Sequence, residues 1–373
     1  MGKLGSIILF GSGETTASGR RVFEHVMQKL PHAPKVALLE TPAGFEPNSA
    51  QVIERVGNFI RHRLQNFDPQ VITIPARQRG TAFSPDDPHI LEPLLSADMI
   101  FIGPGSPTYA VRQLKDSLAW EYVLARHRLG APLVLASAAV IAASTFALPV
   151  YEIYKVGEDL HWKPGLDLFG LYGIPLVFIP HWNNSDGGEE LDTRRCFMGR
   201  ERFARLMDLL PKGLAVLGID EKTSLLMDPG NSDCRVMGAG HVTILHAGHQ
   251  HVEEDTDHYS AQDLSLVARK RKSHIHLYGN REVFPLEKCF PLNQPQGGEG
   301  LDQEVWQHAL EEGKASVQDT PPEQVLRLLE KRKTARQQKD WAVSDNLRGQ
   351  IAALGWNVVD DRDGQRVEKV ERT

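Results

Sequence analysis

Cysteine is scarce in this 373-residue sequence, which contains only Cys196, Cys234 and Cys289. Their odd number and wide spacing exclude a disulfide framework and a cysteine-based zinc site. A reducing, cytoplasmic environment fits this scarcity. Neither sign of charge dominates, because 42 Lys and Arg residues face 48 Asp and Glu residues, for a net charge of −6. No global attraction to nucleic acid or to an anionic membrane is therefore expected.

Charge is also missing from one long stretch, the 23 residues 129–151. Its length alone would allow a membrane span. The overall composition, with 41% hydrophobic and 24% charged residues, is that of an ordinary soluble protein. Ser137, Ser144 and Pro149 interrupt the stretch. We therefore expect a buried strand followed by a helix, and no membrane partner.

The first 220 residues alternate apolar runs with amphipathic helical stretches. The predicted strands are Ser6–Phe10, Lys35–Glu40, Gln70–Ile74, Asp98–Gly103, Pro132–Ala136, Pro175–Ile179 and Leu214–Ile219, with shorter ones at Thr223–Met227, Cys234–Met237 and His241–Leu245. The predicted helices lie near 19–30, 48–66, 107–127, 137–147 and 192–210. Continuous apolar strands are typical of parallel sheets covered on both faces. The pattern predicts an α/β protein with a doubly wound, mostly parallel sheet that binds ligands at the carboxyl ends of its strands.

The chain divides into three parts by composition. Residues 1–292 form the predicted α/β domain, and residues 293–321, rich in Pro, Gly, Gln and acidic residues, are predicted to be a linker. Residues 322–373 are predicted to form a small α-helical domain. Its second helix begins after Asp340, a suitable N-cap, and ends before Gly355.

A serine stands at the turn between the strand Pro132–Ala136 and the helix that follows it. An exposed hydroxyl at a sharp strand-to-helix turn is the context of a hydrolase nucleophile, and the next backbone N–H then faces the developing oxyanion. Ser137 and Ala138 occupy these two positions. The alternative is a buried serine that caps the helix.

A glycine-containing loop follows the strand that ends at Gly103. Glycines at Gly103 and Gly105 let backbone N–H groups approach a ligand or an oxyanion, and Ser106 stands beside them as a substrate contact. The alternative is a plain strand-to-helix turn. The loop lacks the lysine and spacing of a P-loop, and the segment Gly11–Glu14 lacks the third glycine of a dinucleotide fingerprint.

Two further strand ends carry polar side chains. His181 follows an apolar strand and stands beside Asn183, a position that suits a general base with a neighbouring substrate contact. The alternative is a structural histidine in a turn. Asp220 and Glu221 close the next strand, where a carboxylate can orient a histidine or stay solvated. Three arginines could bind a substrate carboxylate or lie on a solvated helix face: Arg194, Arg195 and Arg200.

Five segments together carry a family resemblance. They are Phe10-Gly11-Ser12-Gly13-Glu14, Phe101–Ser106, Ala136-Ser137-Ala138-Ala139, Pro180-His181 and Gly218-Ile219-Asp220-Glu221-Lys222-Thr223. Through them residues 5–245 resemble the cyanophycinase and aspartyl dipeptidase (peptidase E) family of serine hydrolases, which has a flavodoxin-like, class I glutamine amidotransferase-like fold. The resemblance implies that Ser137 is the nucleophile, His181 the base, and Glu221 the group that orients His181. It also implies an oxyanion hole at Ala138 and Gly105, and a small, acidic, peptide-like substrate held by arginines.

The elbow departs from the family pattern, which usually reads Gly-x-Ser-Ala-Gly. Leu135 and Ala139 replace glycines that allow tight packing around a strained nucleophile. Leu135 could relax the turn, so the alternative to a hydrolase of amide bonds is a catalytically inactive ligand-binding protein on the same scaffold. Serine in place of the cysteine of true amidotransferases argues against glutamine-dependent amination.

Residues 322–368 resemble the small C-terminal helical domain of cysteinyl-tRNA synthetases. Leu329-Glu330-Lys331-Arg332, Lys339-Asp340-Trp341-Ala342 and Ala353-Leu354-Gly355-Trp356 are among the segments that carry this resemblance. It implies contact with tRNA or another RNA. No nucleotide-binding motif of a synthetase is present, so we favour docking or homodimerisation as the role of this domain.

Several histidines follow the last predicted strands: His241, His246, His249, His251 and His258. No cysteine or carboxylate completes an obvious ligand set with them. We therefore expect neither a metal nor another cofactor.

Overall fold

The computed structural model describes residues 4–230, 233–248, 276–285, 295, 297–319, 321–361 and 364–369. The chain forms two compact units, Met1–Ala309 and Leu310–Thr373. His249, His251, His258 and Cys289 lie outside the described residues.

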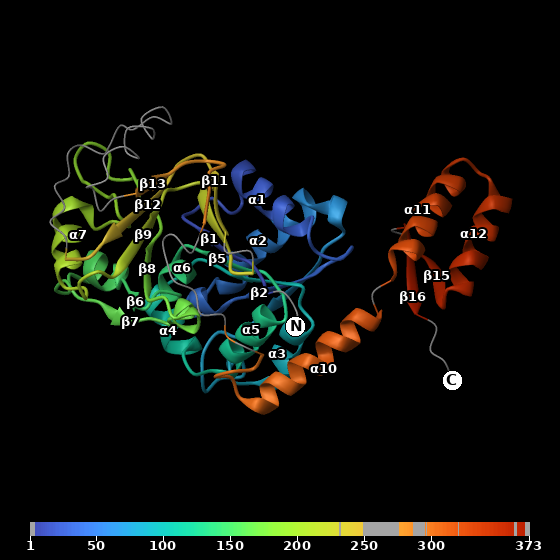
Figure 1. Cartoon of the computed structure of the whole chain (residues 1–373), viewed down its shortest axis with the longest axis horizontal. Helices are drawn as coiled ribbons and strands as arrows, with labels where there is room; N and C mark the ends of the chain where they lie inside the picture. The colour runs from blue at the N-terminus through green and yellow to red at the C-terminus, as the bar shows by residue number, and fades with distance from the viewer. Residues whose placement is uncertain are drawn as a thin grey trace. The chain divides into compact units, whose positions relative to one another are not determined.

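An eight-stranded sheet forms the centre of the first unit (Figure 1), with the order β14-β11-β10-β1-β5-β4-β2-β3. The parallel strands are β1 (Ile7–Phe10), β2 (Lys35–Leu39), β3 (Gln70–Ile74), β4 (Met99–Ile102) and β5 (Leu133–Ala136). Strands β10 (Thr223–Asp228), β11 (Asp233–Gly238) and β14 (Val283–Pro285) extend the sheet in antiparallel fashion. The predicted α/β class with a mostly parallel central sheet is confirmed.

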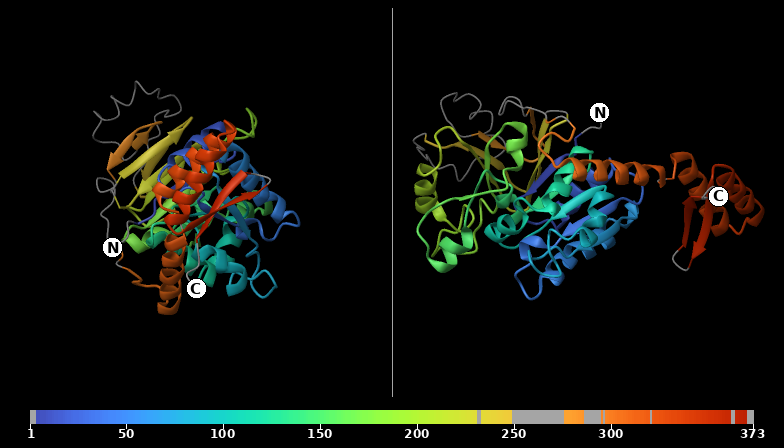
Figure 2. Two further views of the ribbon diagram at one scale, coloured as in Figure 1. Left: turned by 90° about the vertical axis from the view of Figure 1, so that its right-hand side faces the viewer. Right: turned by 90° about the horizontal axis from the view of Figure 1, so that it is seen from below.

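Helices cover both faces of this sheet (Figures 1 and 2). Because side chains alternate along a strand, Ile8 and Phe10 of β1 pack with the helices α1 (Ala17–Met27) and α2 (Ser49–Arg63). Ile7 and Leu9 face the opposite side. That side is covered by α3 (Pro88–Leu95), α4 (Pro107–Leu114), α5 (Leu118–Arg128) and α6 (Ala138–Ala142).

The predicted helix over residues 107–127 is two helices, α4 and α5. Asp116 has a φ of 55°, which a continuing right-handed helix does not allow. The Ser117 side chain then accepts a hydrogen bond from the Trp120 amide and caps α5.

Two strands predicted for the main sheet belong to a separate one. Strands β8 (Leu176–Ile179) and β9 (Ala215–Ile219) pair with β12 (Val242–His246) and β13 (His276–Tyr278), in the order β13-β12-β9-β8. Strand β9 does not continue the main sheet beside β1, because β10 pairs antiparallel with β1 at that position. The expectation of one doubly wound sheet missed this division.

Helix α7 (Gly199–Asp208) is shorter than the helix predicted at 192–210. Arg195, Cys196 and Phe197 have φ values of 57°, 54° and 67°, so this segment cannot be right-handed helix. Short elements complete the unit: the strands β6 (Phe146–Ala147) and β7 (Lys163–Pro164), the 3₁₀ helices η1 (Thr41–Ala43), η2 (Gln65–Phe67) and η4 (Leu168–Tyr172), and the π-helical turn η3 (Glu152–Val156).

Helix α10 (Gln303–Asp319) occupies much of the segment 293–321 that the sequence predicted as a linker. Val305 and Ala309, one helical turn apart, are buried in the core of the first unit. This apolar pair explains why the segment is helical at a point where composition suggested an irregular linker.

The second unit contains the two predicted helices, α11 (Glu323–Gln337) and α12 (Trp341–Ala353). Asp340 caps α12 by accepting a hydrogen bond from the Val343 amide, as predicted. A hairpin of β15 (Trp356–Asp361) and β16 (Gly364–Lys369) adds strands that the prediction of an α-helical domain omitted. The buried Arg332 side chain binds Asp360 at 2.8 and 3.0 Å and thereby joins α11 to β15.

The uncharged stretch 129–151 contains the buried strand β5 and helix α6, as predicted. Leu135 of β5 is 1% exposed, and its neighbours leave no room for a water molecule. Within the described residues, no helix is long and apolar enough to span a bilayer.

Replacing Leu135 with Ala is expected to lower the free energy of unfolding by about 2–5 kcal/mol, because a buried leucine leaves a cavity. Leu209→Ala is the control, since that side chain is 56% exposed and should change stability by less than about 0.5 kcal/mol. Urea unfolding followed by tryptophan fluorescence measures both. Equal stability of the two variants would contradict the anchoring role of Leu135.

Candidate active site

Ser137 lies at the junction of β5 and α6 with a φ of 51° and a ψ of −108°. This conformation lies outside the regions that L-residues ordinarily occupy, and it therefore stores strain. The side chain makes no capping hydrogen bond to the helix, in contrast to the alternative of a helix-capping serine. Its Oγ instead lies 2.9 Å from Nε2 of His181.

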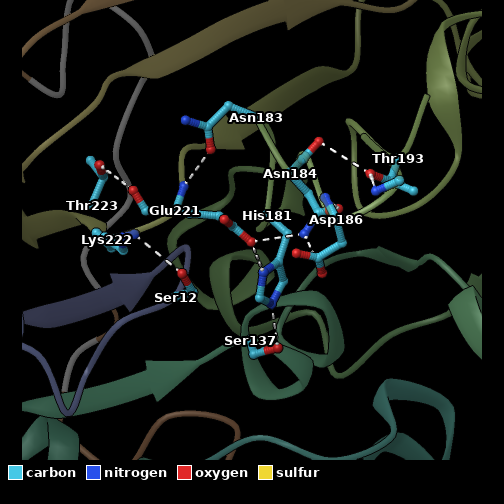
Figure 3. Close-up of polar contacts among 11 residues, drawn as sticks. Ser12, Ser137, His181, Asn183, Asn184, Asp186, Thr193, Glu221, Lys222 and Thr223 are labelled. Atoms are coloured by element: carbon cyan, nitrogen blue, oxygen red, sulfur yellow. Dashed lines mark hydrogen bonds and ion pairs between the residues drawn. The ribbon is translucent and has the colours of Figure 1, made fainter. Parts of the chain in front are cut away.

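His181 follows the end of β8 and also has a left-handed backbone, with a φ of 52°. Its Nδ1 lies 3.0 Å from Oε1 of Glu221, while Nε2 faces Ser137 (Figure 3). A carboxylate can only accept a hydrogen bond, so Nδ1 carries the proton and Nε2 is left to accept the hydroxyl proton of Ser137. The three predicted catalytic residues thus form a chain of two hydrogen bonds with His181 in the middle.

Glu221 lies in the turn between β9 and β10, where the chain passes from one sheet to the other. Two asparagines hold it (Figure 3): Asn184 Nδ2 donates to its Oε1 at 3.0 Å, and its own amide donates to Asn183 Oδ1 at 2.8 Å. The hydrogen bond with His181 lowers the pKa of Glu221, and it outweighs the effect of burial, which raises that pKa. Glu221 is therefore an ionised carboxylate at neutral pH.

Main-chain hydrogen bonds around Gly11, just after β1, join the two sheets at this point. The His181 amide donates to the Gly11 carbonyl at 3.1 Å, and the Gly11 amide donates to the Thr223 carbonyl at 2.9 Å. A Cβ on Gly11 would lie 2.1 Å from the Asp220 carbonyl oxygen. Only glycine fits here. In the sequence, Gly11 is part of a family resemblance and of an incomplete dinucleotide motif, and neither of them predicted this close contact.

The candidate oxyanion donors lie on neighbouring strands. Ala138 is the first residue of α6, so its N–H has no acceptor within the helix. Gly105 follows β4, which pairs in parallel with β5 through Ile102 and Leu135. Gly105 has a φ of 148°, and a Cβ there would lie 2.0 Å from the Pro42 carbonyl oxygen. Its backbone therefore lies at the same end of the sheet as Ser137.

The elbow departures from the family pattern did not relax the turn. Leu135 points into the core beneath α6, where Ala139 and Ala142 are small enough to accommodate it. Ser137 keeps its strained backbone all the same. The family makes space between strand and helix with a glycine at the position of Leu135. Here the small side chains of Ala139 and Ala142 in α6 make that space instead.

The residues expected to contact substrate have other partners in this structure. Asn183 holds the Glu221 amide, and the Ser106 hydroxyl caps α4 through the Tyr109 amide. Arg194 donates from Nε to Asp192 at 2.9 Å. Burial would raise the pKa of Asp192, but hydrogen bonds from the Arg194 side chain and from two amides lower it to about 2.

The other two arginines belong to the same loop. The Arg200 amide also donates to Asp192, at 2.9 Å. The Arg195 guanidinium lies 5.3 Å from the ring centre of Trp182, and its amide donates to the Trp182 carbonyl. This loop lies beside His181, since the Cys196 amide donates to the His181 carbonyl at 3.2 Å.

Two more titratable groups near the site escaped sequence reasoning. Burial, with a smaller effect of the Glu221 charge, raises the pKa of the Cys196 thiol to about 12, so this thiol stays protonated and is no rival nucleophile. Burial also raises the pKa of Glu14, against the opposing charge of His181. Nothing in the motif Gly11–Glu14 signalled that Glu14 would lie near His181.

A pocket of about 850 Å³ begins at Ser106, next to the candidate oxyanion loop, and follows α4. Aromatic side chains of Phe45, Tyr109 and Tyr151 contribute to its wall. Gly103 and Gly105 do not line it, so among the predicted loop contacts it includes Ser106 alone.

No group of His, Cys, Asp or Glu within the described part of the chain has the arrangement of a metal site. His241 is instead engaged by Asp220, whose carboxylate accepts a hydrogen bond from the His241 amide at 2.8 Å. The Asp220 hydrogen bond raises the pKa of the His241 ring.

The chain shares its fold with a solved peptidase structure. A peptidase from an acI-B1 actinobacterium superposes with a TM-score of 0.52 at 20% identity, covering 66% of this chain and 96% of that one. This likeness shows a shared fold and confirms the predicted fold resemblance. A putative peptidase E protein from Listeria monocytogenes EGD-e gives a TM-score of 0.44 at 14% identity, covering 64% of this chain and all of that one.

The second unit matches a different family. Residues 319–367 match the model of the cysteinyl-tRNA ligase anticodon binding domain, which confirms the resemblance predicted for this region. Cysteine–tRNA ligases of Methanosarcina acetivorans and Chlamydia felis are 46% identical over 52 residues and 43% identical over 49 residues. These matches cover 14% and 13% of this chain but 11% and 10% of the ligases, so the chain spans about a tenth of these curated relatives.

Replacing Gly11 with Ala is expected to destabilise the first unit by about 1–3 kcal/mol, because the new Cβ would overlap main-chain atoms that cannot move alone. Gly57→Ala in α2 is the control, since its Cβ would meet only side-chain atoms, the nearest at 3.2 Å. That change should be neutral or stabilising by up to about 1 kcal/mol. Thermal unfolding of the two variants distinguishes these outcomes, and equal Tm values would contradict the tight contact at Gly11.

Proposed function

We propose that the first unit is a serine hydrolase that cleaves an amide bond of a small, peptide-like substrate. The observation that carries the proposal is the chain of hydrogen bonds from Ser137 through His181 to Glu221, at 2.9 and 3.0 Å. The strained elbow at Ser137 supports it, because strained backbones cluster at functional sites. The fold shared with a known peptidase is consistent with it.

In the proposed reaction, each of these three residues has a role. Ser137 Oγ attacks the substrate carbonyl carbon while His181 Nε2 takes the hydroxyl proton, and Glu221 stabilises the imidazolium that forms. The backbone amides of Ala138 and Gly105 donate to the oxyanion, each worth about 3–4 kcal/mol in measured enzymes. His181 then gives its proton to the leaving amine, and water hydrolyses the acyl-enzyme by the same steps.

The pocket of about 850 Å³ is the proposed substrate site, because it begins at Ser106 beside the oxyanion loop. Its charged lining residues are Arg112 of α4, Lys115 directly after α4, Glu46, and the pair Glu152 and Lys163, which lie 3.5 Å apart. Arg112 and Lys115 have no carboxylate partner among the described residues. These two positive charges favour a substrate that carries an acidic group. This assignment replaces Arg194, which Asp192 already engages.

The alternative, a catalytically inactive ligand-binding protein on the same scaffold, rested on a relaxed elbow. Leu135 is accommodated in the core without loss of the Ser137 conformation. The hydrogen bonds of the triad add a second argument for the hydrolase, since a ligand-binding protein has no need of a serine aligned with a histidine and a carboxylate.

A fluorophosphonate probe is expected to label Ser137 of the full-length protein, because the activated hydroxyl attacks phosphorus as it would attack a carbonyl. Ser137→Ala should abolish labelling, and Glu221→Gln should slow it at least tenfold, because the histidine loses its ionised partner. Gel fluorescence and peptide mapping by mass spectrometry measure the site and rate.

Ser185→Ala is the matched control, since Ser185 is exposed and should label no faster or slower than the wild type. Equal labelling of the wild type and Ser137→Ala would overturn Ser137 as nucleophile. A folded wild-type protein that takes no label would favour the inactive alternative.

We propose a second function, tRNA binding, for the second unit. The match to the anticodon binding domain of cysteinyl-tRNA ligases favours it over docking or dimerisation alone. Trp341 at the start of α12 is 57% exposed, and the Arg336 guanidinium lies 5.8 Å from the centre of its ring. An exposed aromatic ring beside a cation is suited to stacking on an unpaired base.

Trp341→Ala in the full-length protein is expected to weaken tRNA binding about tenfold or more, because one stacked base contributes about 1–3 kcal/mol. Leu354→Ala is the control, since this side chain of the same unit is 39% exposed but offers no aromatic face. Filter binding with total tRNA at low salt measures both. Unchanged affinity of Trp341→Ala, or equal losses in both variants, would contradict stacking on Trp341.

A further inference from the structure

Three arginines line one small pocket away from the triad, between α1 and β11. The pocket encloses about 260 Å³, and its lining includes Arg21 of α1, Arg235 of β11 and Arg281 of the turn before β14. The turn is fixed to the sheet, because the Arg281 amide donates to the Val236 carbonyl at 2.7 Å. Three elements distant in the sequence thus bring positive charges to one cavity.

None of these three guanidinium groups has a hydrogen-bond or ion-pair partner among the described residues. His25, one turn along α1 from Arg21, is affected by the positive charge of this region, as its lowered pKa indicates. Burial lowers its pKa, and the charges of Lys29 and Arg235 lower it further. All three arginines are exposed, and their like charges repel one another, so an anion bound between them would relieve this repulsion.

The remaining lining adds hydrogen-bond donors. Ser18 lies in the first turn of α1, where helical N–H groups lack acceptors within the helix and the helix dipole favours a negative charge. Asn280 accepts the Gly238 amide on its Oδ1 at 3.1 Å, which leaves its side-chain NH₂ as a donor. No acidic side chain is part of the lining.

We propose that this pocket binds a small phosphorylated molecule. A planar guanidinium donates two parallel hydrogen bonds to a phosphate. Three such groups offer more donors than the two oxygen atoms of a carboxylate can accept, so they favour a ligand with more oxygen atoms, such as a phosphate. The pocket is smaller than the usual site for a drug-sized ligand, which favours a compact phosphate or pyrophosphate group over a long polymer. The inference does not depend on the activity of Ser137.

Titration of the full-length protein with sodium pyrophosphate in a calorimeter tests the proposal. The wild type is expected to bind, and Arg235→Gln and Arg281→Gln should each weaken binding at least tenfold, because each removes charge-assisted hydrogen bonds. Arg63→Gln, at the exposed end of α2, is the control and should change the affinity less than twofold.

The ligand-free variants provide a check on folding. Arg235→Gln should unfold at the same temperature as the wild type or higher, because it relieves repulsion in the empty pocket. Absence of pyrophosphate binding, or equal losses in all three variants, would overturn the proposal. Binding of a single-stranded RNA that depends on Arg235, without binding of pyrophosphate, would overturn the assignment to a small molecule.

Discussion

The candidate site depends on a set of main-chain hydrogen bonds at Gly11. The two sheets meet there: the Gly11 carbonyl accepts the His181 amide from the small sheet, and its amide donates to Thr223 in the large one. Ser137 directly follows the adjacent strand β5, whose Ala136 pairs with Phe10. Ser137 thus follows a strand of the large sheet, and His181 follows a strand of the small one. A shift of one sheet against the other by about one ångström would therefore separate the serine from the histidine.

Strand ends placed Ser137, His181 and Glu221 at one edge of the predicted sheet, because each residue lies within two positions of the end of an apolar strand. Their grouping as nucleophile, base and orienting carboxylate came from the family resemblance, since the strand pattern alone left structural roles open. The division into two sheets could not be predicted, since it depends on whether β9 or β10 occupies the edge of β1, and both are short apolar runs. Helix α10 was missed for a different reason: its few apolar residues are buried by contact with the first unit, which composition does not reveal.

Leu135 shows what a family motif does and does not require. Glycines beside a nucleophile supply space between strand and helix, but the same space arises when Ala139 and Ala142 face a larger strand residue. The strained backbone of Ser137 is held by the sheet before it and the helix after it, so the volume of its neighbours can be redistributed while the turn is kept.

Several polar residues around the candidate site, Asn183 and Arg194 of the predicted substrate contacts among them, have hydrogen-bond partners within the protein. Asn183 and Asn184 hold Glu221, and Asp192 engages Arg194 and thereby orders the loop beside His181. A short, irregular loop has few backbone partners of its own, so its side chains must satisfy the main chain before they can face a ligand. Under the proposed function, substrate specificity would come from groups that are not already paired, and Arg112 and Lys115 in the pocket along α4 meet that condition in the described part of the chain.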